Sequence, residues 1–192
     1  MNITRNLLAL IGLATVLVVT AGSLVFGQRL ATFDPAFAKV YGSFAWRLWE
    51  SGDAGVAMMW AVPVKDGLGP QEVIDSMKSI AASHNFLFVG ESPFYKQIEA
   101  ITGQPYRYVN FLSFCDAQVG KQMLDYRDQN SGFMPCRIAL VEGKDGKLWL
   151  YSMNLDLMIY GGVQLPADLK AAALGVRDTL RRIMEGAAAG EF

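Results

Sequence analysis

The stretch RYVNFLSFCDAQVGKQMLDYRDQNSGFMPCRIALVEGKDGKLWLYSM, residues 107–153, decides the fold of this chain. Its pattern predicts four elements in the order strand, helix, strand and strand, at residues 106–114, 116–127, 136–142 and 147–153. Asp116 suits the N-cap of the helix, because its short carboxylate can accept the first free backbone N–H groups. Asp145-Gly146 is a hairpin signal between the last two strands. The stretch also holds both cysteines of the chain, but no catalytic signature.

The regions on either side predict further elements around the same core. In chain order, we expect a buried strand, a helix, a short strand, a helix, a helical turn and a last helix, at residues 56–64, 70–84, 86–90, 92–102, 155–160 and 166–186. In the helix that Ser92 and Pro93 begin, Phe94, Ile98 and Ile101 are expected to face inward. The last helix keeps an apolar stripe to its expected end at Gly186, after which the chain is expected to fray. Mixed strands and helices of this kind predict an α+β domain.

Composition limits the classes of function. The 192 residues have room for one domain and an anchor, and 52% of them are apolar against 18% charged. The net charge is −1, and no basic run occurs, so nucleic acid is not an expected partner.

Residues 7–27 are apolar or small and carry no charge, which is long enough for a transmembrane helix. The alternative is a cleaved signal peptide, whose apolar core is shorter and is followed by a cleavage site of small residues. We expect the segment to remain as a single-pass anchor in the cytoplasmic membrane of a bacterium. Arg5 and the amino terminus precede the segment, and Arg29 and then Asp34 follow it. This charge distribution favours an N-terminus on the inside, so the rest of the chain is expected to face the periplasm or the cell exterior, and we expect the periplasmic side. The predicted organisation is an anchor, a juxtamembrane helix, a globular domain and a tail, at residues 1–29, 30–54, 55–187 and 188–192.

An amphipathic helix is predicted directly after the anchor, from Asp34-Pro35 to Ser51. It carries Phe44, Trp46 and Trp49, and tryptophan is enriched where a protein meets the membrane surface. Two interpretations stay open. These aromatic residues contact lipid headgroups or another subunit, or the helix packs on its own domain.

The chain resembles a bacterial family called domain of unknown function 302 over about residues 69–186. The resemblance rests on Phe114-Cys115-Asp116, on Met134-Pro135-Cys136-Arg137 running into a strand, on the Asp145-Gly146 hairpin, on the Met158 segment and on the final helix. It implies a mainly antiparallel sheet with packed helices, similar to the TATA-binding-protein-like arrangement. It also implies frequent dimers and no established activity. The chain departs from the family at Asp116, where asparagine is common, and in its anchor and first amphipathic helix.

An antiparallel sheet would bring Cys115 and Cys136 to the same end, since the second strand then starts where the first one ends. Three interpretations of the pair stay open. The cysteines form a structural disulfide or two inert thiols. Alternatively they form a redox-active pair, because Cys115 precedes a helix N-terminus. As a third possibility they bind Cu(I), with Met134 as the nearest thioether and Met58, Met59, Met153 and Met158 as further candidates.

Other chemistry has little support in the sequence. His84 is the only histidine of the chain, which excludes a His-rich metal site. It lies in the last turn of a predicted helix, where the helix dipole favours a histidine, so it needs no other role. The phosphate-binding, dinucleotide-binding, Gly-x-Ser-x-Gly and Cys-x-x-Cys motifs are absent. We therefore expect a non-enzymatic accessory or partner-binding protein of a larger membrane complex, without a cofactor. Its expected partners are the lipid bilayer and either another membrane protein or a second copy of the chain. The alternative is a thiol-based redox or copper-handling protein.

Overall fold

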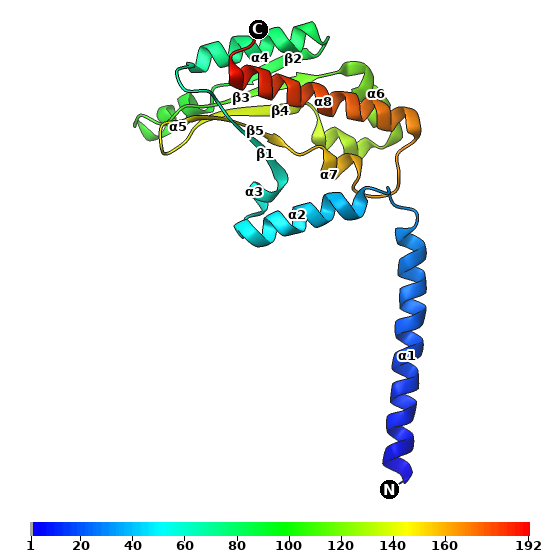
Figure 1. Cartoon of the computed structure of the whole chain (residues 1–192). Helices are drawn as coiled ribbons and strands as arrows, with labels where there is room; N and C mark the ends of the chain where they lie inside the picture. The colour runs from blue at the N-terminus through cyan, green and yellow to red at the C-terminus, as the bar shows by residue number, and fades with distance from the viewer. Residues whose placement is uncertain (1) are drawn as a thin grey trace.

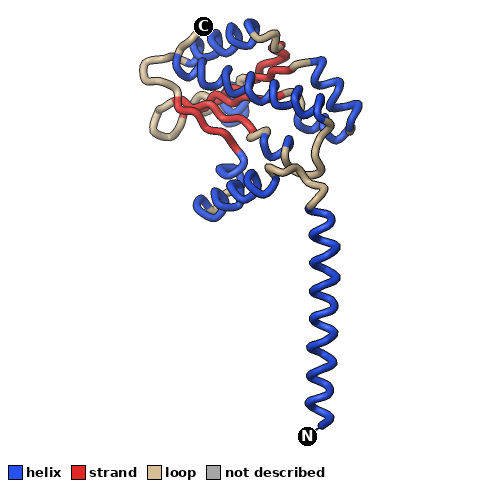
Figure 2. The backbone as a smooth tube through the Cα atoms, turned by 45° about the vertical axis from the view of Figure 1, so that its right-hand side comes forward, coloured by secondary structure: helices blue, strands red, loops and turns tan. Residues whose placement is uncertain are grey.

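The structure is a computed structural model that describes residues 2–192. A long helix, α1 (Asn2–Leu30), projects away from an α+β body (Figure 1). Between them lies α2 (Phe37–Ser51), which runs across the base of the body at a steep angle to α1 (Figures 1 and 2). Within α1, residues Asn6–Leu30 are long and apolar enough to cross a membrane, and none of that window is buried inside the protein.

Among residues 2–192, five strands form one sheet in the order β1-β5-β4-β3-β2. Their bounds are β1 (Met59–Pro63), β2 (Leu87–Ser92), β3 (Val109–Cys115), β4 (Cys136–Glu142) and β5 (Leu148–Met153). Every neighbouring pair is antiparallel, so the expected α+β fold with an antiparallel sheet is confirmed. The predicted hairpin is confirmed as well, since the turn between β4 and β5 places Gly146 at φ 77°, a conformation that favours glycine.

The remaining helices surround this sheet. They are α3 (Ala54–Met58), α4 (Pro70–Ser83), α5 (Phe94–Thr102), α6 (Ala117–Tyr126), the 3₁₀ helix η1 (Asp128–Phe133), α7 (Asp156–Ile159) and α8 (Ala167–Ala189). Helices α4 and α8 pack on one face of the sheet, whereas α2 and α3 lie below its β1 edge in the view of Figure 1.

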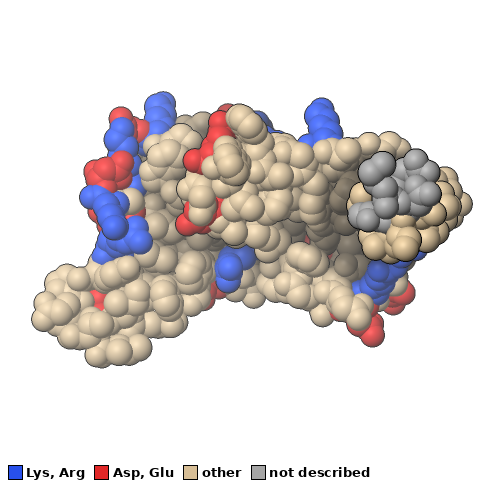
Figure 3. Space-filling model, turned by 90° about the horizontal axis from the view of Figure 1, so that it is seen from below, with Lys and Arg blue, Asp and Glu red and all other residues tan. Residues whose placement is uncertain are grey.

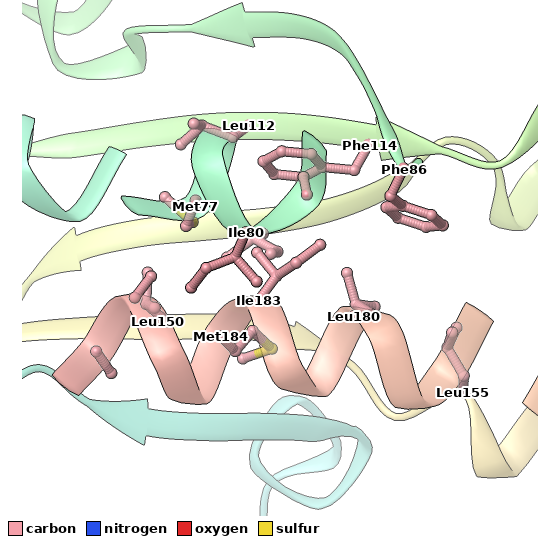
Figure 4. Close-up of a cluster of buried hydrophobic side chains, with 14 of the residues drawn as sticks. Met77, Ile80, Phe86, Leu112, Phe114, Leu150, Leu155, Leu180, Ile183 and Met184 are labelled. Atoms are coloured by element: carbon pink, nitrogen blue, oxygen red, sulfur yellow. The ribbon is translucent and has the colours of Figure 1, made fainter. Parts of the chain in front are cut away.

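The core lies between the sheet and helices α4 and α8 (Figure 4). Alternate residues of β3, β4 and β5 point into it, and Leu112, Phe114, Ile138, Leu140 and Leu150 are completely buried. From α8, Leu180, Ile183 and Met184 meet them, and Met77 and Ile80 do so from α4 (Figure 4). Full burial of each such side chain stabilises the folded protein by about 1.5–3 kcal/mol. This core fixes the positions of the strand ends at which the candidate site lies.

The connection between α1 and α2 is tied to the segment before α8. Phe33 pairs with Val163 in an antiparallel bridge, and the Asp34 N–H donates to the carbonyl of Gly162 at 2.8 Å. Asp34 is only 3% exposed, and its carboxylate accepts hydrogen bonds from the Lys170 ammonium and from the Ala36 N–H. Burial raises the pKa of Asp34, but these hydrogen bonds and the charge of Lys170 outweigh burial, so its pKa is lowered overall. This charge pair joins the base of α1 to the body.

The structure corrects the expected buried strand at residues 56–64. Ala54–Met58 forms α3 instead, because Asp53 caps it by accepting a hydrogen bond from the Val56 N–H at 3.1 Å. The strand starts at Met59 and lies at the edge of the sheet.

Two expectations about helices are also wrong. All of α5 is described, and none of its residues is buried. Ile101 is 85% exposed, and the main contacts of α5 are with β3. Helix α8 does not end at Gly186 but continues to Ala189. Glycine is needed at 186 because a Cβ there would lie 2.6 Å from Cδ1 of Ile80 in α4. The following residues pack rather than fray, with Ala187 and Ala188 both buried.

Candidate functional site

The two cysteines lie at one end of the sheet, where β3 ends and β4 begins. Cys136 is paired directly with Phe114, the residue before Cys115. The chain between them forms α6 and η1 and returns antiparallel, as the resemblance implied. Both cysteines, the only two in the sequence, are half-buried free thiols in the described structure.

A cavity of about 40 Å³ opens beside the two thiols. It lies among the ends of β3 and β4, helix α6, η1, α7 and the start of α8. Cys115, Cys136, Met123, Met134 and Met158 supply the sulfur-bearing side chains of its wall. Most of the other lining side chains are apolar, and the polar ones are Asp116 and Asn130. We call this space the sulfur cavity.

Gly120 in α6 keeps the sulfur cavity open. A Cβ at this position would lie 3.3 Å from Sδ of Met134 and 3.7 Å from Sγ of Cys115. The two sulfur atoms therefore face the same small space, and a larger residue at 120 would fill it.

The polar groups around the cavity already have structural roles. The carboxylate of Asp116 accepts hydrogen bonds from the N–H groups of Gln118 and Val119, so it caps α6 as predicted. The side-chain amide of Asn130 donates to the carbonyl of Met123 at 2.9 Å. Within residues 2–192 there is no group of three or more His, Cys, Asp and Glu side chains that could hold a metal ion. Any ligand of the cavity would thus be bound mainly by sulfur.

The environment keeps both thiols protonated at neutral pH. Burial raises the pKa of Cys136 to about 11, and the neighbouring Cys115 adds to the effect. Burial also raises the pKa of Cys115, and the charge of Asp116 acts in the same direction. A redox nucleophile needs a lowered thiol pKa, so the expected activation of Cys115 by the helix N-terminus finds no support here.

The sequence found only part of the sulfur cavity. Met134 and Met158 line it as considered. Met59 and Met153 instead line a neighbouring groove, which shares Met134 and Cys136 with the cavity. Met123 was missed, although it lies on the inward face of the helix that Asp116 begins. His84 is exposed at the end of α4, and its Nδ1 lies 3.0 Å from the carbonyl oxygen of Ile80, so it is not among the residues that line this cavity.

A second candidate surface is formed by α2. Trp46 is 62% exposed and Trp49 is 83% exposed, so neither indole ring packs into its own domain. Phe44 is placed differently: it is half-buried, and its ring centroid lies 6.3 Å from that of Tyr41. We call the outward side of α2, with Trp46 and Trp49, the tryptophan face.

The opposite side of α2 is fixed to the body. The Tyr41 hydroxyl donates to the carbonyl of Leu157 at 3.0 Å, and Arg47 donates to the carbonyls of Val56 and Met59. Gly161 allows the first contact, since a Cβ there would lie 2.7 Å from the Tyr41 hydroxyl. These bonds hold α2 in one orientation and direct the tryptophan face away from the sheet.

A groove of about 480 Å³ lies on the sheet face that α4 and α8 leave free. Phe111, Ala139 and Tyr151 form a row across β3, β4 and β5 at its floor. Arg137 lies over the ring of Phe111 at 5.3 Å. Figure 3 views the protein from the side on which α1 leaves, and charged side chains form separate small groups on this side. The groove and the tryptophan face are thus two candidate contact surfaces of the protein outside α1.

Comparison with known proteins gives a family and a fold. The family described as domain of unknown function DUF302 matches residues 60–187. The crystal structure of a conserved DUF302 protein from Bacillus stearothermophilus is similar, with a TM-score of 0.55 and 15% sequence identity. The match covers 66% of this chain and 95% of that chain, and at this identity it concerns the fold alone. No curated protein matches the chain. Helices α1, α2 and α3 precede the part that matches the family.

Proposed function

The chain belongs to the DUF302 family, and from this premise we propose that it is a membrane-anchored accessory protein that binds a partner. Helix α1 spans the cytoplasmic membrane of a bacterium, and the DUF302 domain lies on the periplasmic side. There the domain acts without catalysis, as a subunit of a larger membrane complex.

The observation that carries this proposal is the arrangement of α1 and α2. A candidate membrane span leads directly into a helix that runs across the base of the domain (Figure 1). That helix points its two tryptophans outward and binds the domain with its other side. Indole rings are favourable at the level of the lipid headgroups, because they have a large apolar body and a polar N–H. With α1 in the bilayer, the tryptophan face lies at that level.

The groove on the free sheet face supports the partner-binding part of the proposal. Its floor is an apolar row of half-buried side chains, and apolar, aromatic-rich surfaces of this kind are common at protein interfaces. The floor of the groove lies on the sheet face opposite the core that α4 and α8 cover, so these helices leave it free for a partner.

Two measurements test the anchor and its orientation. We expect the protein extracted from its native membrane to keep residues 7–27, as its intact mass will show. A mass that lacks about 25 N-terminal residues would mean that α1 is a cleaved signal peptide. We further expect alkaline phosphatase fused after Phe192 to be active in the periplasm and to sediment with membranes. The same fusion without α1 is the control, and it should be inactive; activity of that control, or inactivity of the full fusion, contradicts the proposed orientation.

The partner is tested by photo-crosslinking in native membranes. A photoreactive amino acid at Tyr151, in the groove, should give one discrete adduct with another membrane protein or with a second copy of the chain. The matched control is the same substitution at Lys121, whose side chain is 77% exposed on α6, outside the groove. Equal labelling at both positions, or no adduct at Tyr151, would contradict partner binding at the groove.

A further inference from the structure

We propose that the sulfur cavity is a Cu(I) site, in which the Cys115 and Cys136 thiolates bind the ion together with the thioethers of Met134 and Met158. This inference goes beyond the proposed accessory role and does not rest on it, because it depends only on groups inside the DUF302 domain.

The side chains that line the sulfur cavity determine which metal ion it would bind. Thiolate and thioether are soft donors that favour Cu(I), whereas carboxylate and carbonyl oxygens suit Mg²⁺ and Ca²⁺. Here five sulfur-bearing side chains line one space of about 40 Å³. The one carboxylate at the cavity, that of Asp116, caps α6. A soft monovalent ion therefore fits the donor set better than a hard divalent one.

The position of the sulfur atoms is the second observation. Sδ of Met134 and Sγ of Cys115 approach the same point above Gly120, at 3.3 and 3.7 Å from the place of a Cβ. Cys136 lines the same cavity, and its backbone is paired with Phe114, the residue before Cys115. The thiols and a thioether thus converge from β3, β4 and the segment after η1.

Core filling alone does not explain this arrangement. Flexible methionines usually close gaps in a core, since interiors pack as tightly as organic crystals. Here Met123, Met134 and Met158 surround a space that holds at least one water-sized sphere, about 10–15 Å³. Cys115 and Cys136 are both half-buried, so neither residue is sealed inside the core.

Binding has a defined proton balance. Each thiol must lose its proton to bind as a thiolate, so one Cu(I) bound by both cysteines releases two protons to the buffer. No electron is transferred, and the ion stays Cu(I).

The test uses the full-length chain in detergent, without oxygen, titrated with Cu(I) against a chromophoric Cu(I) chelator. We expect one Cu(I) per chain in native mass spectrometry. The variant with Cys115→Ser and Cys136→Ser should lose more than about 100-fold in affinity, since loss of outer-shell partners alone costs about 10–100-fold. Binding that is absent, or equal in this variant, overturns the proposal.

Two further variants separate metal binding from folding. Met134→Leu with Met158→Leu keeps the side-chain volume and should lose about 10-fold or more. The matched control, Met77→Leu with Met184→Leu, changes buried methionines outside the cavity and should bind like the wild type. Circular dichroism checks that each variant is folded. A loss of binding in the control equal to that in the Met134 and Met158 variant would assign the effect to the core and overturn the role of the two thioethers.

Discussion

Two amphipathic helices of this protein, α2 and α8, use their apolar residues in opposite ways. In α8, eight residues are buried, and Leu180 and Ile183 reach the centre of the core. In α2, which is described throughout, no residue is buried, and the largest side chains, Trp46 and Trp49, point outward. The sequence pattern of both helices is similar, so amphipathicity alone does not tell where a helix places its apolar side.

The difference follows from what holds each helix. Burial holds α8 in the domain that matches the DUF302 family. A few directed bonds hold α2, which precedes that domain: one from Tyr41, two from Arg47 and the Asp34–Lys170 pair beside it. Helix α2 is therefore an addition to the DUF302 domain that hydrogen bonds hold in position. Its outward side remains free for another contact.

The largest expected effect is on the core side of this comparison. Ile183→Ala removes a completely buried side chain at the meeting of α8 and α4, so it should lower the free energy of unfolding by about 2–5 kcal/mol. Urea unfolding of the full chain in detergent measures it. Trp49→Ala is the matched control and should change the free energy by less than about 0.5 kcal/mol. Comparable losses in both variants would show that α2 is part of the core.

The next effect concerns the Asp34–Lys170 pair. Lys170→Met leaves a carboxylate buried without its cation, which should cost about 1–3 kcal/mol at pH 7. In the wild type the pKa of Asp34 lies below its usual 3.8, so the stabilisation is present above that value and is lost as the pH falls through the lowered pKa.

The pH dependence of the variant should have the opposite sign. Without Lys170, burial outweighs the remaining hydrogen bond from the Ala36 N–H and raises the pKa of Asp34. The carboxyl group therefore becomes neutral as the pH falls, and the loss of stability relative to the wild type shrinks. Urea unfolding should therefore show a large difference in the free energy of unfolding between the wild type and Lys170→Met at pH 7, and a small difference at pH 4. A difference that is equal at both values would mean that the lost contact is not one of charge.

A smaller effect tests how α2 is held. Tyr41→Phe removes the hydroxyl that donates to Leu157 and should cost about 0.5–1.5 kcal/mol. Amide hydrogen exchange should become faster in α2 and stay unchanged in α8. If exchange rises equally in both helices, the bond supports the whole domain and the two helices do not differ as described.

How far the sequence predicts this structure depends on whether the signal is local. The Asp116 cap, the Asp145-Gly146 hairpin and the end of α2 before Gly52 are local signals, and all were predicted. Two features depend on distant contacts and were not predicted. Gly186 lies inside a helix rather than at its end, at a point where a Cβ would lie 2.6 Å from Cδ1 of Ile80 in α4, and Ile101 of α5 is 85% exposed. The late start of the strand expected from Val56 was missed although its cause, the Asp53 cap of α3, is local.

The candidate site shows the same division. The sequence identified the two cysteines as candidate site residues, and the antiparallel sheet that the family resemblance implied places them at the same end of the sheet. The cavity between them was not predicted, because it depends on Gly120 and on the fold of η1. The direction of Trp46 and Trp49 was open from the sequence, because their spacing does not say which side of the helix meets the domain.

The most direct test of the account is the depth of the tryptophan face in a bilayer. The chain has four tryptophans, so the full protein with Trp60→Phe and Trp149→Phe leaves only Trp46 and Trp49 to report. In vesicles of phosphatidylcholine and phosphatidylglycerol, we predict that lipids brominated near the headgroup quench this fluorescence strongly and lipids brominated near the chain ends quench it weakly. The reverse pair, with Trp46→Phe and Trp49→Phe, should show little quenching. Fluorescence that neither lipid quenches in the first protein would contradict the claim that α2 lies at the membrane surface.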